Sequence, residues 1–182
     1  MTARSQRTPA ELARSASEVC KDWTTAAELV HQAETTFPHV RSAEQTAVIT
    51  AVIVHYRCLV NFVSGNYDGK WGRHDICPED FTGAPWWPSD QELDREMRGR
   101  LNVLNTEQQH VSWKRLEGNM TLWPVGFLIR EVSFALSEFT DLLLQRNLPG
   151  AVEFDQARRT AAPLLPPKRF RAISAVDPAP SR

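Results

Sequence analysis

Residues 89–118 read SDQELDREMRGRLNVLNTEQQHVSWKRLEG, and this stretch predicts a long helix at the centre of the fold. Ser89 and Glu92 have the spacing of a capping box, and Pro88 before them disfavours helix further upstream. Apolar side chains then recur in alternating steps of four and three, which is the spacing of one helical face. Gly118 is the expected end of the helix. The expected inward-facing positions are Leu93, Met97, Leu101, Leu104, Gln108, Val111 and Arg115.

A second stripe on the same predicted helix is polar and consists of Arg98, Asn102, Asn105 and Gln109. Two interpretations stand side by side. Four polar groups in register can line a cleft, whereas residues of these types are most often simply exposed to solvent. His110 lies on a third line of the helix, where it is either a structural histidine or a catalytic one.

Three further helices follow from the same kinds of signal. Thr8-Pro9-Ala10-Glu11 is a strong helix start, and the pattern after it runs to about Thr35. Residues 47–63 are apolar on nearly every side, which predicts a helix buried among others. Thr121 can cap a last long helix, which Asn147-Leu148-Pro149-Gly150 would end. Because no hairpin signal is present, the sequence predicts an all-α bundle of four main helices.

The remaining segments connect or flank these helices. Residues 66–88 are rich in Gly, Pro and Trp, and we expect a long loop that packs onto the body between the second and third helices. Residues 151–160 predict a short extra helix. We expect one domain over residues 1–160, and a Pro-rich, basic and disordered tail over residues 161–182.

Composition narrows the class of protein. The chain has 182 residues, 42% of them hydrophobic, and a formal net charge of −1, which fits one domain with a full core and gives no overall nucleic-acid footprint. Cys20, Cys58 and Cys77 form no CxxC pair, which argues against a disulfide framework or a zinc site. We therefore expect no metal and no cofactor. No signal-peptide pattern opens the chain, so a cytoplasmic location is expected.

Arg57 is conspicuous because it interrupts the apolar helix predicted over residues 47–63. A buried guanidinium keeps its charge and requires a partner or a wet cleft. We hypothesise that Arg57 pairs with Asp75 and thereby holds the Trp-rich loop. A binding cleft is expected from the residues Arg57, Asn61, Asp75, Trp87, Asn102 and Asn105.

The order of these parts resembles the HEPN superfamily of helical bundles, which occur in toxin–antitoxin and phage-defence systems. The resemblance covers roughly residues 8–145. It rests on Tyr56-Arg57-Cys58-Leu59-Val60-Asn61-Phe62, on a loop with acids and Trp (Asp75, Asp80, Trp87), and on Leu104-Asn105…His110…Trp113…Arg115. It implies a metal-independent ribonuclease in which His110 acts as general acid or base and Arg115 or Arg57 stabilises the phosphorane charge. HEPN ribonucleases carry an Arg shortly before this His, whereas Asn105 stands at that position here.

Two functions of different classes follow. The first is a non-enzymatic binding or interaction module, which needs no catalytic set. The second is the HEPN-like ribonuclease. For partners we expect another protein or a second copy of the chain, with RNA as a further candidate and no membrane, because the apolar helix is too short and too polar to span one.

Overall fold

The computed structural model describes residues 7–36, 43–64, 76–108 and 125–165, and over these residues it is helical and contains no strand. The predicted all-α fold is therefore confirmed. The helices, in chain order, are α1 (Pro9–Thr36), α2 (Ala43–Ser64), α3 (Pro78–Thr82), α4 (Gln91–Gln108), α6 (Val125–Gln145), α7 (Ala151–Ala161) and the 3₁₀ turn η1 (Ala162–Leu164).

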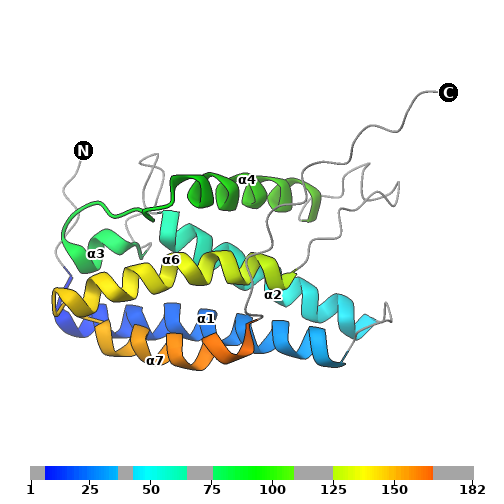
Figure 1. Cartoon of the computed structure of the whole chain (residues 1–182), viewed down its shortest axis with the longest axis horizontal. Coiled ribbons are helices and arrows are strands. Elements are labelled where there is room, and N and C mark those ends of the chain that lie inside the picture. Colours follow the sequence, from blue (N-terminus) through cyan, green and yellow to red (C-terminus); the bar gives the residue numbers. More distant parts are fainter. Residues whose placement is uncertain (1–6, 37–42, 65–75, 109–124, 166–182) are drawn as a thin grey trace.

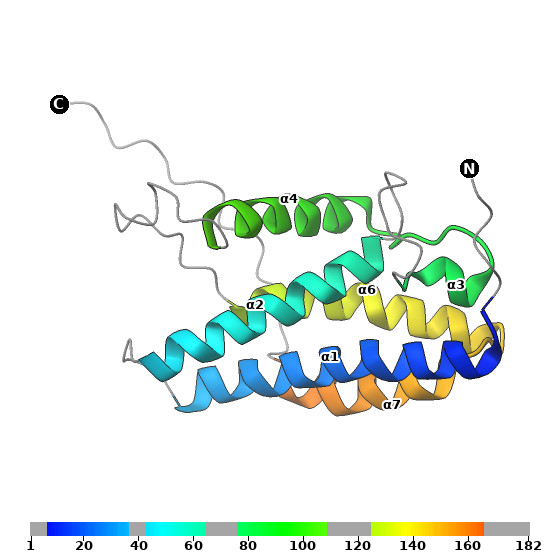
Figure 2. The ribbon, with the colours of Figure 1, turned by 180° about the vertical axis from the view of Figure 1, so that it is seen from behind.

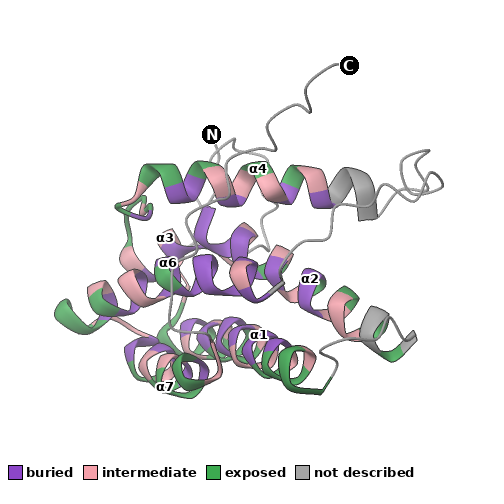
Figure 3. Cartoon of the chain, turned by 45° about the vertical axis from the view of Figure 1, so that its right-hand side comes forward, coloured by how far each residue is buried: buried purple, intermediate pink, exposed green. Residues whose placement is uncertain are grey.

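The long helices lie in three layers (Figure 1). α1 and α7 form the lowest layer in this view, α2 and α6 the middle one, and α4 lies across the top; the view from behind shows the same order (Figure 2). α1 and α7 run in one direction, and α2 and α6 run in the other. Buried residues line the sides of the helices that face one another (Figure 3). The core therefore lies chiefly between the two lower layers, and α4 closes it from above.

α1 forms as its sequence predicts. The Thr8 amide donates to Glu11 Oε2 at 2.7 Å, and the Glu11 amide donates to Thr8 Oγ1 at 3.3 Å, which is the reciprocal geometry of a capping box. All the apolar positions spaced by four and three residues are buried: Leu12, Ala16, Val19, Trp23, Ala26 and Val30.

α4 begins one residue later than expected, at Gln91, and its cap is Asp90 instead of Ser89. Asp90 Oδ1 accepts hydrogen bonds from the amides of Glu92 at 3.1 Å and Leu93 at 3.0 Å. The Ser89 amide instead donates to both carboxylate oxygens of Glu138 on α6, at 2.8 and 3.0 Å. This contact with a distant helix fixes the chain before α4 and leaves the capping position to Asp90. Leu93, Met97, Leu101 and Leu104 are buried as predicted, while the expected continuation of the helix to Gly118 lies outside the described residues.

Asp90→Ala should lower the free energy of unfolding by about 1 kcal/mol, the usual effect of losing a helix N-cap. Ser89→Ala is the matched control, since its contact uses the backbone amide; it should change stability by less than about 0.5 kcal/mol. Urea denaturation of both variants measures the two values. A larger effect from Ser89→Ala than from Asp90→Ala would contradict the assignment of the cap.

α7 forms over Ala151–Ala161, which confirms the short extra helix predicted over residues 151–160, and it packs as part of the bundle. Asn147 takes a left-handed conformation with φ 50°, and the Leu148 amide donates to the Leu143 carbonyl at 2.9 Å, which terminates α6 as a Schellman motif does. Gly150, with φ 83°, then starts α7. This tight turn brings the helix back along α1 and α6, where Phe154 is fully buried.

The Trp-rich connection contains the short helix α3, which the sequence had not indicated. Phe81 of α3 and Trp86 pack against the core. The ring centres of Trp86 and Phe139 lie 5.0 Å apart, and those of Phe81 and Phe154 lie 5.9 Å apart. These rings fix the part of the connection nearest to α4. Residues 65–75 of the same connection lie outside the described part.

Candidate functional site

The residues expected to form a cleft are spread over two elements. Arg57 and Asn61 lie on α2 and are half-buried, Trp87 before α4 is 46% exposed, and Asn102 on α4 is exposed. Asn105 lies on α4, and its side chain is not described. Asp75, His110 and Arg115 lie outside the described residues, so the Arg57–Asp75 pair and the ribonuclease hypothesis both stay predictions.

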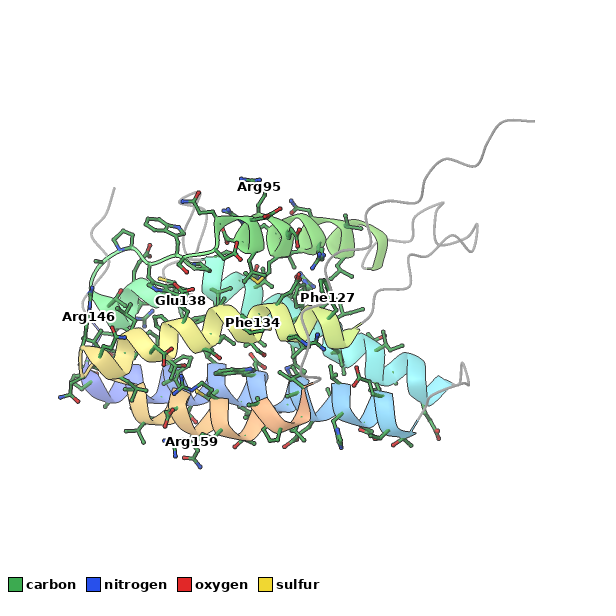
Figure 4. The ribbon with its side chains drawn as sticks, in the orientation of Figure 1. Arg95, Phe127, Phe134, Glu138, Arg146 and Arg159 are labelled. Atoms are coloured by element: carbon green, nitrogen blue, oxygen red, sulfur yellow. The ribbon has the colours of Figure 1, made fainter. Side chains whose placement is uncertain are left out.

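A hollow of about 400 Å³ lies beside the start of α4, lined by Trp87, Pro88, Gln91, Asp94, Arg95 and Arg98. Of the expected cleft residues that are described, Trp87 alone is among them. Arg98 forms an ion pair with Asp94 one turn earlier, and Arg95 points away from the body (Figure 4). This hollow therefore does not bring Trp87 together with Arg57, Asn61 and Asn102.

The polar stripe on α4 is a solvated face where it is described. Asn102 is exposed, and Arg98 is held by Asp94 on its own helix. On α2, Arg57 Nε is buried and has no hydrogen-bond partner within the described part of the chain. The predicted partner, Asp75, lies outside the described residues, and Arg57 itself is half-buried. The prediction that Arg57 has a partner or reaches a wet cleft therefore stays a prediction.

A second basic residue in an apolar helix lies in a more enclosed setting. Arg130 is the only basic residue of α6, and only 5% of it is exposed. Its Nε and Nη1 atoms are buried and have no hydrogen-bond partner among the described residues. A guanidinium stays charged at any physiological pH, and burying a charge without a partner is costly. Such a group in a folded protein indicates a strained structural position or a place prepared for an anion.

Arg130 borders a cavity of about 180 Å³ that lies between α1, α6, α7 and the end of η1. We call this cavity the Arg130 pocket. Trp23 contributes from α1, Ser133, Phe134 and Ser137 from α6, Arg158 from α7, and Ala162 and Leu165 from η1 and the residue after it. Figure 4 shows Phe134 on the face of α6 turned toward the viewer, above α7.

Most other polar groups of the Arg130 pocket already have partners. The Trp23 indole donates to Ser133 Oγ at 2.8 Å, and Ser133 Oγ donates in turn to the Ile129 carbonyl at 2.7 Å. Ser137 Oγ donates to the Ser133 carbonyl at 2.7 Å. Arg158 pairs with Asp141 at 2.6 Å and with Asp155 at 2.5 Å. Arg130 is therefore the charged group of this pocket whose donors remain unsatisfied.

Arg130 was not among the site residues predicted from the sequence. The signal was the same one that drew attention to Arg57, a single cation in an otherwise apolar stretch. The apolar residues of this helix that recur in steps of three and four are buried, namely Leu128, Val132, Ala135, Phe139 and Leu143.

Cys20 and Cys58 are poor nucleophiles. Burial raises the pKa of Cys20 to about 12, and burial together with the Asp22 carboxylate raises the pKa of the exposed Cys58. Among the residues that the structure describes, no three His, Cys, Asp or Glu side chains gather as a metal site would require.

One of the described helices is long and apolar enough to cross a membrane, namely α2 over Ala47–Ser64. Some 44% of that window is buried inside the protein, and core helices of globular proteins share its length and composition. The half-buried His55 on α2 also bonds Asp22 of α1, with 2.8 Å between Nδ1 and Oδ1. Over the described residues, the fold and the pocket beside Arg130 define this chain as a helical-bundle protein with a basic pocket.

Comparison with protein-family models, with characterised proteins and with solved structures finds no match for this chain. The resemblance to HEPN proteins accordingly stays an expectation that the geometry neither supports nor opposes.

Proposed function

We propose that this protein is a non-enzymatic binding module and that it holds an anionic group of its ligand in the Arg130 pocket. The observation that carries the proposal is the buried side chain of Arg130, whose Nε and Nη1 atoms have no hydrogen-bond partner among the described residues. An anion entering the pocket would supply a negative charge and hydrogen-bond acceptors beside Arg130 that the described residues do not supply. Charge-assisted bonds from arginine to such groups are among the stronger polar interactions in proteins.

The surroundings of Arg130 favour an anion over a cation. Of the residues lining the pocket, two are arginines and none is a carboxylate. Arg158, the other arginine of the lining, is already paired with two carboxylates, Asp141 and Asp155. Arg130 is thus the arginine of the lining that forms no ion pair with a described residue.

The same lining supports binding rather than catalysis. A general base or a nucleophile needs a histidine, a carboxylate, a thiol or an activated hydroxyl within reach of the reacting atom. The lining includes only the hydroxyls of Ser133 and Ser137, and both donate their protons to carbonyls of α6. A cation can stabilise charge, but alone it provides no group to transfer a proton.

The proposal is tested by titrating the full chain with a panel of small anions by isothermal titration calorimetry, and by repeating the titration with Arg130→Met. At least one anion should bind the parent protein and lose most of its affinity in the variant. Arg159→Met is the matched control, because the Arg159 side chain is 80% exposed and points outward from α7 (Figure 4). If no anion shows dependence on Arg130, or if the protein cleaves RNA and His110→Ala abolishes that cleavage, the proposal is wrong.

A further inference from the structure

The dimensions and lining of the Arg130 pocket narrow the class of its ligand, if the proposed binding function holds. We infer that the pocket takes a small monocarboxylic acid with an apolar body of about one ring, and that the carboxylate pairs with Arg130. The inference rests on three features of the pocket: its size, the distribution of polar and apolar walls, and the single uncompensated charge.

The volume of the pocket suits a ligand group of about one ring. Its volume is about 180 Å³, whereas sites for drug-sized ligands usually measure about 300–1,000 Å³. A protein cavity of about 150 Å³ holds one benzene molecule. One aromatic ring or a short aliphatic chain, together with a carboxylate, therefore fits this volume. Because the pocket is partly open to solvent, its volume describes the group that it holds and sets no upper limit on the whole ligand.

The walls are apolar away from Arg130. The Trp23 indole forms part of one side with its N–H already bonded to Ser133. Leu165 and Ala162 contribute aliphatic surface at the end of η1, and Phe134, which is 45% exposed, contributes its ring from α6. An apolar ligand body would pack against these groups. A polar ligand body would lose its hydrogen bonds to water and gain none from these walls, which costs binding free energy.

The charge of the pocket suits one negative charge rather than two. Arg158 is engaged by two carboxylates, so Arg130 is the one guanidinium with donors to spare. Its planar array of N–H groups matches the two oxygens of a carboxylate. Phosphate or sulfate would need further donors, and both serine hydroxyls of the pocket already donate to backbone carbonyls.

Binding should be measured by isothermal titration calorimetry of the full chain with benzoate and hexanoate as probes, and with benzamide, sulfate and phosphate for comparison. Benzoate or hexanoate should bind at least about tenfold more tightly than benzamide, which has the same shape but no charge, a tenfold change corresponding to about 1.4 kcal/mol. Arg130→Met should weaken binding of the acid by tenfold or more, and Arg159→Met should change it by less than twofold. Ser137→Leu, which fills the cavity but keeps Arg130, should also abolish binding and serves where Arg130→Met does not fold.

The alternative outcomes separate this inference from the proposed function. Sulfate or phosphate that binds as tightly as benzoate, with the same dependence on Arg130, would overturn the monocarboxylate while the anion-binding function stands. A peptide with a free C-terminal carboxylate that binds when benzoate does not would likewise overturn it. If none of these probes depends on Arg130, both the inference and the proposed function fail.

Discussion

Arg130→Met should make the unliganded protein more stable, by about 1–3 kcal/mol in the free energy of unfolding, because an unpaired buried charge is replaced by an apolar side chain of similar length. Arg130 is 5% exposed, and its Nε and Nη1 atoms have no hydrogen-bond partner among the described residues. The unfolded chain hydrates this guanidinium fully, whereas the folded chain does not. Removing the charge therefore removes a cost that only the folded state carries.

Urea denaturation at pH 7 measures this effect, with Arg159→Met as the control, which should shift stability by less than about 0.5 kcal/mol as an exposed substitution. A gain in stability together with a loss of anion binding is the pattern expected of a group retained for function. A loss of more than about 1 kcal/mol in Arg130→Met would show instead that Arg130 supports the fold.

Arg100→Met should lower the free energy of unfolding by about 3–5 kcal/mol, because it removes one partner of a buried ion pair. Arg100 on α4 pairs with Glu131 on α6, and their side chains are only 14% and 8% exposed. Its guanidinium also lies 4.5 Å from the centre of the Phe127 ring and pairs with Glu96 at 3.0 Å. These contacts join the top layer to the middle one.

Glu131→Gln should cost less than Arg100→Met, since Arg100 would still have Glu96, whereas Glu131 without Arg100 has no described cation beside it. The double variant Arg100→Met/Glu131→Gln should lose much less stability than the sum of the two single losses, as residues in direct contact do. Urea denaturation of the three variants supplies the comparison. Simple additivity would show that the pair does not contribute as a unit.

The effect of Arg100→Met should also depend on pH. Burial raises the pKa of Glu131 above its ordinary value, and the Arg100 guanidinium opposes that rise. Because the folded-state pKa exceeds the unfolded one, the folded state binds more protons between the two values, and the contribution of Glu131 to stability falls as pH rises through that window. Loss of Arg100 should raise the folded-state pKa of Glu131 further and so widen the pH range between its two pKa values. The loss in free energy of unfolding caused by Arg100→Met should therefore be smaller near pH 5, where Glu131 is more protonated, than near pH 7.5.

The starts of α1 and α4 show when local sequence is enough to predict a helix cap and when it is not. The Thr8 capping box formed as predicted because its donors and acceptors lie within one turn of each other. The cap of α4 did not, because two adjacent residues, Ser89 and Asp90, can both serve. The choice between them depends on Glu138, which lies 49 residues further along the chain and bonds the Ser89 amide. The predicted cleft also depended on distant parts of the chain. Its residues were grouped by the helix face on which they lie, but whether they meet depends on how the helices cross.

The sequence by itself determined the long helices of this protein, their principal buried faces and the end of α6 at Asn147, because caps and periodic apolar stripes act over a few residues. Only the tertiary structure decided which polar groups meet. The Trp23 indole bonds Ser133, which is 110 residues away, and Arg100 reaches Glu131 on another helix. Arg57 and Arg130 look alike in sequence, as single cations in apolar helices, yet only Arg130 is closed in at a cavity by α1, α6 and α7. The difference arises from how the helices pack, and a pattern along one helix does not contain it.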